Sequence, residues 1–548
     1  MKKELAAKIS SILSEAVKKN KITGASVSIV SGDGPAYSEG FGFADVKNSV
    51  PAGTDTIFKI GSITKVFTAS ALMLFAEAGK VNIDGPVTDY IPEFSVKSRF
   101  PDARPITVRD LLCHHSGLPC DDMRNYFSDD PSAFKNCVDY LKEAYAPYPP
   151  GKMFYYSNLG YDLLGVIIER LSGMPFYKYM EEAVLGRLGM KSSGIVLDEQ
   201  LKKRVSKPYA SGKEQVERLM KDIPPGGIFS NAPDMALFMN AALSNGTGLF
   251  NNQDTAGKMF NVQYPGNPYD FNYNSCLGWF SGKPGLDHAG PVYRHDGGTP
   301  NFFSLVVLVP KYRLGITLLT NCAAGALFNH TISVEILSLI LESEYSLKPE
   351  PDAGRNSIPL TSSMAEKTSG RFMTLSGITE IRRSSGRLLA RLPQGTFIMT
   401  PNADGWFSLA FLLFGIFPLK LKQLSILRLG VVCINNERIL AVEQVGFRSA
   451  TGKEFRPLNS PAEWEKLSGA YSCVNDPSPR IAAFVLKRSP EGMVILIEGG
   501  KMGKLKLYLD ALSSVEAVII GMGRYSGETV KAQGESIFIL GLEFRKTV

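Results

Sequence analysis

The sequence has few of the side chains that build metal centres and disulfide frameworks. Its 548 residues include seven cysteines and five histidines. The number of cysteines is odd, and they form no C-x-x-C pair and no zinc-like spacing with histidine. The neighbours His114 and His115 would point apart on either a helix or a strand. We therefore expect no metal and no cofactor, and we expect free thiols, as in a reducing compartment.

Long hydrophobic runs are also missing. The most apolar stretch, Leu409 to Leu419, is shorter than the ~20 residues of a membrane-spanning helix, and Gly415 and Pro418 interrupt it. We therefore expect no membrane span. The stretch should form a buried strand or loop, with an exposed lid, a dimer contact or a membrane-touching loop as the alternatives.

The start of the chain lacks the unbroken apolar segment of an export signal. Charged residues recur through residues 4 to 20, which predicts an amphipathic helix and a cytoplasmic protein. The net charge of +7 arises from 60 Lys and Arg against 53 Asp and Glu, and the basic residues are scattered. Nucleic-acid binding needs a concentrated basic patch, so we do not expect nucleic acid as a partner.

The length predicts several domains, because single cores stop growing near roughly 250 to 300 residues. In residues 1–346, strands near 25–30, 302–310 and 315–321 enclose a set of helices, which indicates an α+β domain with one antiparallel sheet and a helical layer. The proline-rich residues 347–359 are the expected linker. Helices are predicted at 64–79, 107–114, 132–144, 159–172, 176–188, 232–244 and 329–344.

The remainder of the chain contains an internal repeat. EKTSGRFMT (366–374) matches EKLSGAYSC (465–473), and the Glu-Phe-Arg at 454–456 matches the Glu-Phe-Arg at 543–545. Each unit consists of short alternating strands. We therefore expect two small antiparallel β-barrels, in residues 360–458 and 459–548.

Ser62 and Lys65 are the central candidates for chemistry. They lie in IGSITKVFTAS, at the start of the predicted helix 64–79. Positions three apart share one helix face, so the amine can reach the hydroxyl, and the helix dipole favours a developing alkoxide. A serine needs such a base to act as a nucleophile. Ser62 could instead be a simple N-cap, but a lysine directed into an apolar helix would then be costly and unexplained.

A second Ser-x-x-Lys, at Ser132 and Lys135, shows that this spacing alone is weak evidence. Asp130, Pro131 and Ser132 together are typical of a helix cap on a polar face. We therefore expect a structural role for this pair.

Tyr156 and Asn158 form the only Tyr-x-Asn in the chain. A phenol near a lysine ammonium can be held partly ionised, because the cation offsets the cost of the phenolate. Such a tyrosine could shuttle the serine proton. Taken alone, the pair is more typical of a core aromatic beside an Asn helix cap.

His295, Gly297 and Gly298 precede a predicted strand in YRHDGGTPNFFSLVV. Glycines at a strand start allow close backbone approach, and an N–H there could form an oxyanion hole with the N–H of Ser62. The same His-x-Gly pattern also occurs at His115 and His288. In isolation, a histidine in a turn is therefore the simpler interpretation.

Together and in this order, these elements resemble the family of class C β-lactamases, penicillin-binding carboxypeptidases, D-aminopeptidases and related esterases. The segments RDLLCHHSGLP, PPGGIFSNAPDMALF and RHDGGTPNF add to the likeness, which covers about residues 5 to 345. The resemblance implies a β-lactamase/transpeptidase-like catalytic domain followed by lipocalin-like barrels. It also implies roles for four residues: Ser62 as nucleophile, Lys65 and Tyr156 as the proton-transfer pair, and Asn158 as a contact for the substrate amide.

By the same resemblance, His295 stands where the β-lactamases carry a lysine, and the Gly298 N–H completes the oxyanion hole. A mostly neutral imidazole replaces a permanent cation, which argues against strong binding of a penicillin carboxylate. The histidine form is similar to that of D-aminopeptidases, in which a barrel loop selects a free amino terminus. The acidic turn at 475–477 is a candidate for that loop, although an ordinary exposed turn explains it as well.

These inferences predict a serine hydrolase that acts through an acyl-enzyme on amide or peptide bonds, as a peptidase or D-aminopeptidase-like enzyme. The alternatives are a β-lactamase or carboxyl esterase of the same family, and a non-catalytic protein whose barrels hold an apolar ligand. The expected partner is a small-molecule or peptide substrate. Strand edges and the apolar stretch would also permit a homo-oligomer.

Overall fold

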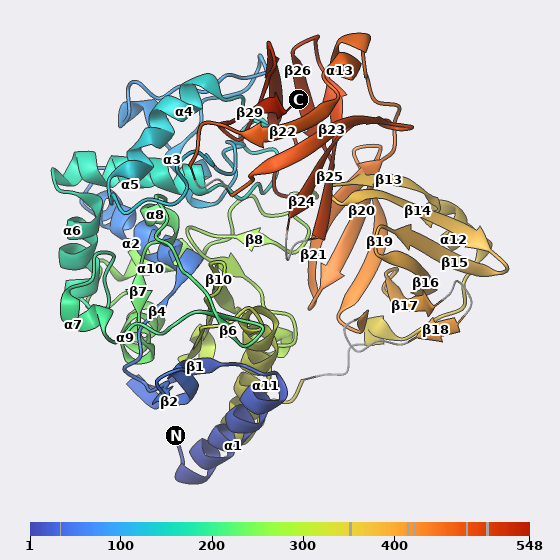
Figure 1. Cartoon of the computed structure of the whole chain (residues 1–548). Helices are drawn as coiled ribbons and strands as arrows, with labels where there is room; N and C mark the ends of the chain where they lie inside the picture. The colour runs from blue at the N-terminus through green and yellow to red at the C-terminus, as the bar shows by residue number, and fades with distance from the viewer. Residues whose placement is uncertain are drawn as a thin grey trace.

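The computed structural model describes residues 1–32, 34–349, 353–413, 417–419, 424–477, 480–499 and 503–547. It contains an α+β domain, built from α1 to α11, and two barrels that follow it in the chain. Figure 1 shows the α+β domain on the left, barrel 1 (β13 to β21) on the right, and barrel 2 (β22 to β29) above, in contact with both.

The α+β domain is organised around an eight-stranded sheet of order β3-β2-β1-β12-β11-β10-β9-β8. Its neighbouring strands are antiparallel, and the central ones are continuous apolar runs because both faces are covered. Along β11, Leu305 and Val307 pack on α1 and α11, while Val306 and Leu308 pack toward α2 and α9. The strands are β1 Gly24–Ser31, β2 Gly34–Asp45, β3 Val50–Pro51, β8 Asn274–Ser275, β9 Phe280–Ser281, β10 Tyr293–Gly298, β11 Phe303–Val309 and β12 Leu314–Thr320.

The helical layer surrounds α2 (Thr64–Glu77), which is buried along nearly its whole length. Two expected helices differ in detail: 132–144 is a 3₁₀ turn, Ala133–Asn136, followed by α4, and 176–188 is α6 followed by a π-helical turn, Glu181–Gly186. The other helices are α1 Lys3–Lys19, α3 Val108–Leu112, α4 Cys137–Glu143, α5 Asn158–Ser172, α6 Phe176–Met180, α7 Glu199–Lys202, α8 Ile223–Gly226, α9 Ala232–Leu243, α10 Gln253–Phe260 and α11 Gly325–Tyr345. Short strands β4 Phe58–Lys59 and β7 Phe229–Ser230 pair with each other, as do β5 Tyr209–Ala210 and β6 Lys213–Glu214.

The repeat in the sequence corresponds to the two barrels. In each, a short helix (α12 Ser362–Thr368 or α13 Ala462–Lys466) leads into the first strand. Barrel 1 closes through the β16–β17 pairing, and barrel 2 closes through β22–β29. The strands of barrel 1 are β13 Gly370–Thr374, β14 Gly377–Ser384, β15 Arg387–Leu392, β16 Gly395–Pro401, β17 Phe407–Leu413, β18 Phe417–Leu419, β19 Leu427–Ile434, β20 Glu437–Gln444 and β21 Phe447–Glu454. Those of barrel 2 are β22 Gly469–Cys473, β23 Ala483–Ser489, β24 Gly492–Gly499, β25 Gly503–Ala511, β26 Glu516–Ile520, β27 Thr529–Gln533, β28 Ser536–Ile539 and β29 Leu542–Thr547. The predicted fold class is confirmed.

The apolar stretch from Leu409 to Leu419 belongs partly to β17 and β18 of barrel 1. Leu412 is buried, but its neighbours in β17 are only half-buried and Leu419 is 39% exposed. The predicted strand is therefore present as β17, but the expected burial is only partial. Residues 414–416 lie outside the described part of the chain. Among the described residues, we find no helix with the length and apolar character needed to cross a membrane.

Trp464 should be a main stabilising residue of barrel 2. Its side chain is fully buried, and its indole N–H donates to the Ser513 carbonyl at 2.9 Å. Trp464→Ala should lower the free energy of unfolding by about 3–5 kcal/mol, because a large cavity replaces the ring. Urea unfolding followed by far-UV circular dichroism measures this. Val485→Ala, a truncation at a residue that is 39% exposed in the same barrel, is the control; equal losses in the two variants would contradict the assignment.

Candidate active site

Ser62 and Lys65 meet as their spacing predicts. Ser62 lies in a 3₁₀ turn, Gly61–Ile63, that leads directly into α2. The Lys65 Nζ donates to the Ser62 Oγ at 3.2 Å. The turn requires a left-handed residue at Gly61, whose φ is +52°. The local backbone thus brings the amine onto the hydroxyl within one turn.

Lys65 is completely buried and is held by two further acceptors. Its Nζ donates to the Asn158 Oδ1 at 2.8 Å and to the Pro225 carbonyl at 3.0 Å. Burial lowers the pKa of Lys65 well below its usual value, and the Arg524 guanidinium lowers it further, while buried carboxylates such as Asp162 act in the opposite direction. The site therefore favours the neutral amine, which is the form that can accept a proton.

Tyr156 completes the group around the hydroxyl. Its ring centroid lies 4.7 Å from the Lys65 Nζ, and its ring stacks on His114 at 4.3 Å. Burial raises the pKa of Tyr156, although a hydrogen bond with the Ser62 side chain lowers it in part. The expected partly ionised phenol is therefore not favoured here, because a buried phenolate loses more solvation than the neighbouring groups restore.

Asn158 is the first residue of α5, after the N-cap Ser157. Its Oδ1 accepts from Lys65, and its Nδ2 donates to the Asp121 Oδ1 at 2.7 Å. Both ends of the amide are thus engaged within the protein. This geometry supports a role in positioning Lys65, in addition to the substrate contact that the resemblance implies.

The third predicted element, in β10, packs directly against the turn that carries Ser62. A Cβ at Gly297 would lie 1.9 Å from the Ile60 carbonyl oxygen, so only glycine permits this approach. The Ser304 Oγ donates to the same carbonyl at 2.6 Å and fixes the two segments together. Gly298 lines the cavity next to Ser62.

His295 lies beside these glycines, and its side chain is 2% exposed. Its Nδ1 forms a hydrogen bond with the Asp296 carbonyl oxygen at 2.8 Å. Burial lowers the pKa of His295 to about 4, and the nearby Lys65 contributes to the shift. The imidazole is therefore neutral at physiological pH, as the sequence predicts.

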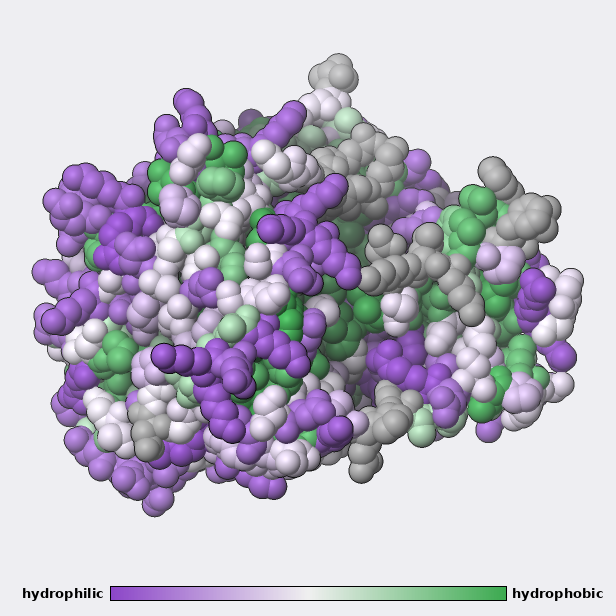
Figure 2. All heavy atoms as spheres, turned by 90° about the horizontal axis from the view of Figure 1, so that it is seen from below, coloured by the Kyte–Doolittle hydropathy of each residue, from purple (hydrophilic) through white to green (hydrophobic). Residues whose placement is uncertain are grey.

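A cavity of about 460 Å³ opens over Ser62 and is lined by residues of all three parts of the molecule. Its walls are largely aromatic. The α+β domain contributes Ser62, Met153, Phe154, Tyr155, Tyr156, Tyr269, Asp270, Tyr273, Phe280, His295, Asp296 and Gly298, barrel 1 contributes Ser449 and Ala450, and barrel 2 contributes Gly523 and Arg524. Seen from below, hydrophobic side chains gather in a hollow between the α+β domain and barrel 1 (Figure 2).

Arg524 is the main site residue that sequence reasoning missed. It lies in the β26–β27 loop of barrel 2 and forms a two-pronged ion pair with the Asp121 Oδ2, with the Nη2 at 2.5 Å and the Nε at 3.2 Å. Asp121 in turn accepts from Asn158. The only signal in the sequence was the glycine-rich segment GMGRYSG at 521–527, which is typical of a tight loop and says nothing of its destination.

The β26–β27 loop is anchored in the α+β domain by buried polar contacts. The Cys120 N–H donates to the Glu528 Oε1 at 2.9 Å, and the Tyr155 hydroxyl donates to the Ser526 carbonyl at 3.0 Å. The candidate turn at 475–477 instead contacts Asn125, whose N–H donates to the Asp476 Oδ2 at 2.9 Å, and it does not line the cavity. Barrel 2 therefore reaches the site through the β26–β27 loop and not through the candidate turn at 475–477.

The second Ser-x-x-Lys pair lies on the surface, away from these groups. Ser132 occupies the N-cap position of the 3₁₀ turn but forms no side-chain cap; its hydroxyl donates to the Asp130 Oδ1 at 2.8 Å instead. Lys135 pairs with Glu169 at 3.3 Å. The hydroxyl and amine thus have separate partners. Nowhere in the part of the chain that the structure describes do three or more His, Cys, Asp or Glu side chains form a metal-binding group.

The Beta-lactamase family model matches residues 9–335, which include Ser62, Lys65 and Tyr156. The protein belongs to this family.

Several relatives have moderate sequence identity to this chain. Protein flp of Staphylococcus aureus (strain MRSA252) is 28% identical over 323 residues, which cover 57% of this chain and 62% of that protein. The chain thus spans less than two thirds of this relative. Penicillin-binding protein 4 of Amycolatopsis lactamdurans is 27% identical over 321 residues, covering 56% of this chain and 82% of that protein.

Two solved structures share the fold beyond the α+β domain. The octameric penicillin-binding protein homologue from Pyrococcus abyssi matches with a TM-score of 0.56 at 23% identity, over 81% of this chain and 99% of that one. SurE, solved with D-Leu, matches with a TM-score of 0.56 at 20% identity, over 82% of this chain and all of that one (100%). In both cases the match extends beyond the length of the α+β domain.

His295 should make the stability of the protein depend on pH. Its pKa is about 4 in the folded state and about 6.5 in an unfolded chain. Between these values only the unfolded state takes up the proton, so stability falls as the pH falls through this window, by about 3 kcal/mol. His295→Gln should lose this part of the pH dependence. Urea unfolding at several pH values tests it, with His288→Gln as the matched control; parallel curves for all three proteins would contradict the prediction.

Arg524→Gln should move the acid limb of the kcat/KM profile to higher pH. The Arg524 cation lowers the pKa of Lys65, so its removal should raise that pKa and leave less neutral amine at a given pH. Arg524→Lys should keep the limb near its original position. Profiles recorded from about pH 5 to pH 10 would show the shift. Arg545→Gln, at a side chain that is 66% exposed in the same barrel, is the control. If Arg524→Gln instead lowered kcat/KM by the same factor at every pH, Arg524 would have a purely structural role.

Proposed function

We propose that this protein hydrolyses amide bonds of peptide-like substrates through an acyl-enzyme formed on Ser62. One observation carries the proposal: the Nζ of the buried Lys65 lies 3.2 Å from the Ser62 Oγ, within hydrogen-bond distance, and burial lowers the pKa of this amine. A neutral amine in contact with a serine hydroxyl is the base that a serine nucleophile requires.

The proposed reaction begins when the neutral Lys65 amine takes the Ser62 proton as the Oγ attacks the carbonyl carbon. The N–H groups of Ser62 and Gly298 hold the resulting oxyanion. Tyr156 donates its phenolic proton to the leaving nitrogen and recovers a proton from the Lys65 ammonium. The C–N bond then breaks, and a water molecule hydrolyses the ester on Ser62 with the same groups in reverse.

The cavity favours a peptide over a penicillin-type substrate. His295 is neutral, so it does not offer the cation that would bind a carboxylate at its position. The aromatic walls formed by Phe154, Tyr273 and Phe280 suit apolar side chains. The structural neighbour solved with D-Leu supports a peptide-like substrate that contains a D-residue.

The charges around the cavity indicate whether a peptide substrate must carry a free amino terminus. Arg524 places a cation in the lining, and the carboxylates of Asp270 and Asp296 are already engaged by His115 and by Arg294, respectively. A substrate ammonium therefore has no unpaired carboxylate to bind among the described lining residues. These contacts support a peptidase that does not require a free amino terminus over a strict D-aminopeptidase.

A substrate panel tests the reaction class. Peptide or acyl nitroanilides, with and without a free amino group and in both D and L forms, should be cleaved faster than a nitrophenyl ester relative to their uncatalysed rates. A chromogenic cephalosporin should be a poor substrate. Faster turnover of the cephalosporin or of the ester alone would instead identify a β-lactamase or a carboxyl esterase.

Ser62→Ala should abolish turnover of every substrate, since proton transfer contributes roughly 10²- to 10⁴-fold and each oxyanion donor roughly 10²- to 10³-fold, and both act only on the bound nucleophile. Mass spectrometry after incubation with a fluorophosphonate should show one adduct on the unaltered protein and none on Ser62→Ala. Ser132→Ala, at the second Ser-x-x-Lys, is the matched control. Retained activity in Ser62→Ala would remove the assignment.

We also propose that the protein self-associates, because its structural neighbour from Pyrococcus abyssi is octameric. Light scattering after size exclusion measures the mass directly. A monomer at all concentrations would reject this proposal and leave the chemistry untouched.

A further inference from the structure

A second cavity, larger than the one over Ser62, lies in the α+β domain. Its volume is about 770 Å³, within the range of roughly 300 to 1,000 Å³ that small-molecule sites occupy. The long segment 205–220 forms one side, β4 and β7 form the floor, and residues 128–131 and 195–197 close the remaining sides. No residue lines both this cavity and the one over Ser62. We call it the Lys59 pocket.

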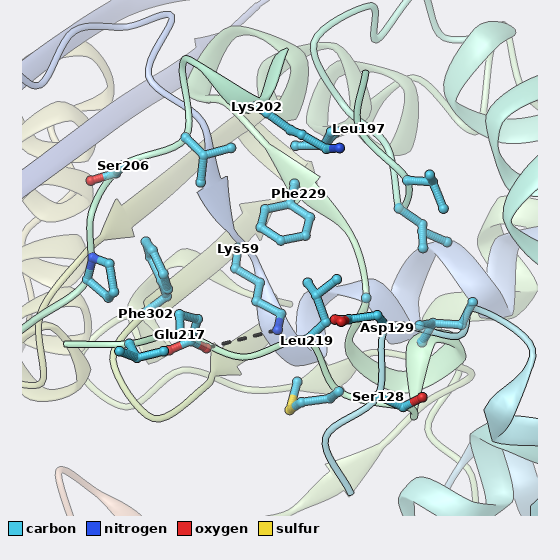
Figure 3. Close-up of a pocket in the computed structure, with 18 of the residues that line it drawn as sticks. Lys59, Ser128, Asp129, Leu197, Lys202, Ser206, Glu217, Leu219, Phe229 and Phe302 are labelled. Atoms are coloured by element: carbon cyan, nitrogen blue, oxygen red, sulfur yellow. Dashed lines mark ion pairs between the residues drawn. The ribbon is translucent and has the colours of Figure 1, made fainter. Parts of the chain in front are cut away.

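A buried ammonium stands at the floor of the Lys59 pocket. The Lys59 side chain is 2% exposed and extends from β4 past the ring of Phe229 into the pocket (Figure 3). Its Nζ donates to one backbone carbonyl, that of Arg218, at 3.3 Å. Burial lowers the pKa of Lys59, and the nearby Glu217 carboxylate raises it in part. One long hydrogen bond leaves most of the donor capacity of this amine unused.

Glu217 faces Lys59 but does not bond it directly. The Glu217 Oε1 lies 4.0 Å from the Lys59 Nζ, beyond hydrogen-bond distance, and it has no hydrogen-bond partner although it is buried. The Oε2 is fixed by the Asn301 Nδ2 at 3.1 Å. The dashed line in Figure 3 marks this separated pair. A buried acceptor and a buried donor thus lie close together in the lining of the same pocket.

The rim of the pocket carries exposed aliphatic side chains beside exposed charged ones, which are Asp129, Asp130, Lys202, Lys207 and Glu214. Val196, Val216 and Leu219 are 51%, 84% and 43% exposed, and all three line the pocket. Large aliphatic side chains that cluster around one opening are typical of a surface that receives an apolar ligand. The pocket therefore combines an entrance of mixed aliphatic and charged side chains with a polar floor.

We propose that the Lys59 pocket binds an aliphatic molecule that ends in an uncharged head group with a donor and an acceptor on one edge, as in a primary carboxamide. The carbonyl oxygen of the head group accepts from the Lys59 Nζ, and its N–H donates to the Glu217 Oε1. Both unused groups are then satisfied at once, which removes the cost of burying them unpaired.

The charge of the floor selects against ionised head groups. A carboxylate would bring a second negative charge beside Glu217, and an ammonium would bring a second positive charge beside Lys59. Each ionised head group is attracted by one of these two side chains but repelled by the other, and it can satisfy only one of them. The same apolar chain with an ionised end should therefore bind more weakly than the carboxamide.

Calorimetric titration of the Ser62→Ala protein with octanamide, octanoate and octylamine tests this proposal. Octanamide should bind at least about tenfold more tightly than the two ionised probes, which corresponds to one satisfied polar contact of about 1.4 kcal/mol. Lys59→Met should weaken octanamide at least about tenfold. Lys202→Met, the same change at an exposed lysine of the pocket rim, should leave it unchanged.

Leu219→Asp provides a second variant that does not disturb the floor, in case Lys59→Met fails to fold. A charge at this exposed rim residue should also weaken octanamide. The proposal is overturned if octanamide does not bind, if octanoate or octylamine binds equally well, or if neither Lys59→Met nor Leu219→Asp changes the affinity. Because the binding is measured without the Ser62 hydroxyl, its result is independent of the proposed hydrolysis.

Discussion

The candidate site depends on the burial of one amine. Lys65 lies in α2 at the centre of the α+β domain, where a charged ammonium is costly and a neutral amine is not. Its three hydrogen bonds fix the Nζ in place beside Ser62. Packing around α2 therefore sets both the position and the protonation of the proposed base, and every other part of the site acts through this one contact.

Barrel 2 is linked to that contact by a continuous chain of polar interactions. Arg524 pairs with Asp121, Asp121 accepts from Asn158, and Asn158 accepts from Lys65. Because each member is buried or held by the next, a displacement of the β26–β27 loop would leave the Asp121 charge unpaired in the interior, which is strongly unfavourable. The barrel is thus part of the site, and its closed strands give the loop a rigid support.

The sequence was informative where the determinants were local. Ser62 and Lys65 are one helical turn apart, and Gly297 occupies a backbone position that only glycine permits. Spacing and residue type, together with the family resemblance, therefore predicted both. The two barrels were visible because their repeat preserves the helix-strand start of each unit. Arg524 and Asp121 could not be paired in this way, since they lie in separate units and no local pattern connects them. The pKa of Tyr156 was misjudged for a related reason: its burial depends on distant segments.

Two buried lysines six positions apart show how their partners decide what such a residue can do. Lys65 has three hydrogen-bond partners, one of them the Ser62 hydroxyl. Lys59 has one long bond and a carboxylate 4.0 Å away, with a large cavity between them and solvent. The first arrangement is complete and suited to proton transfer. The second lacks a partner, and a bound molecule that supplies one would gain the interaction that the protein leaves unmade.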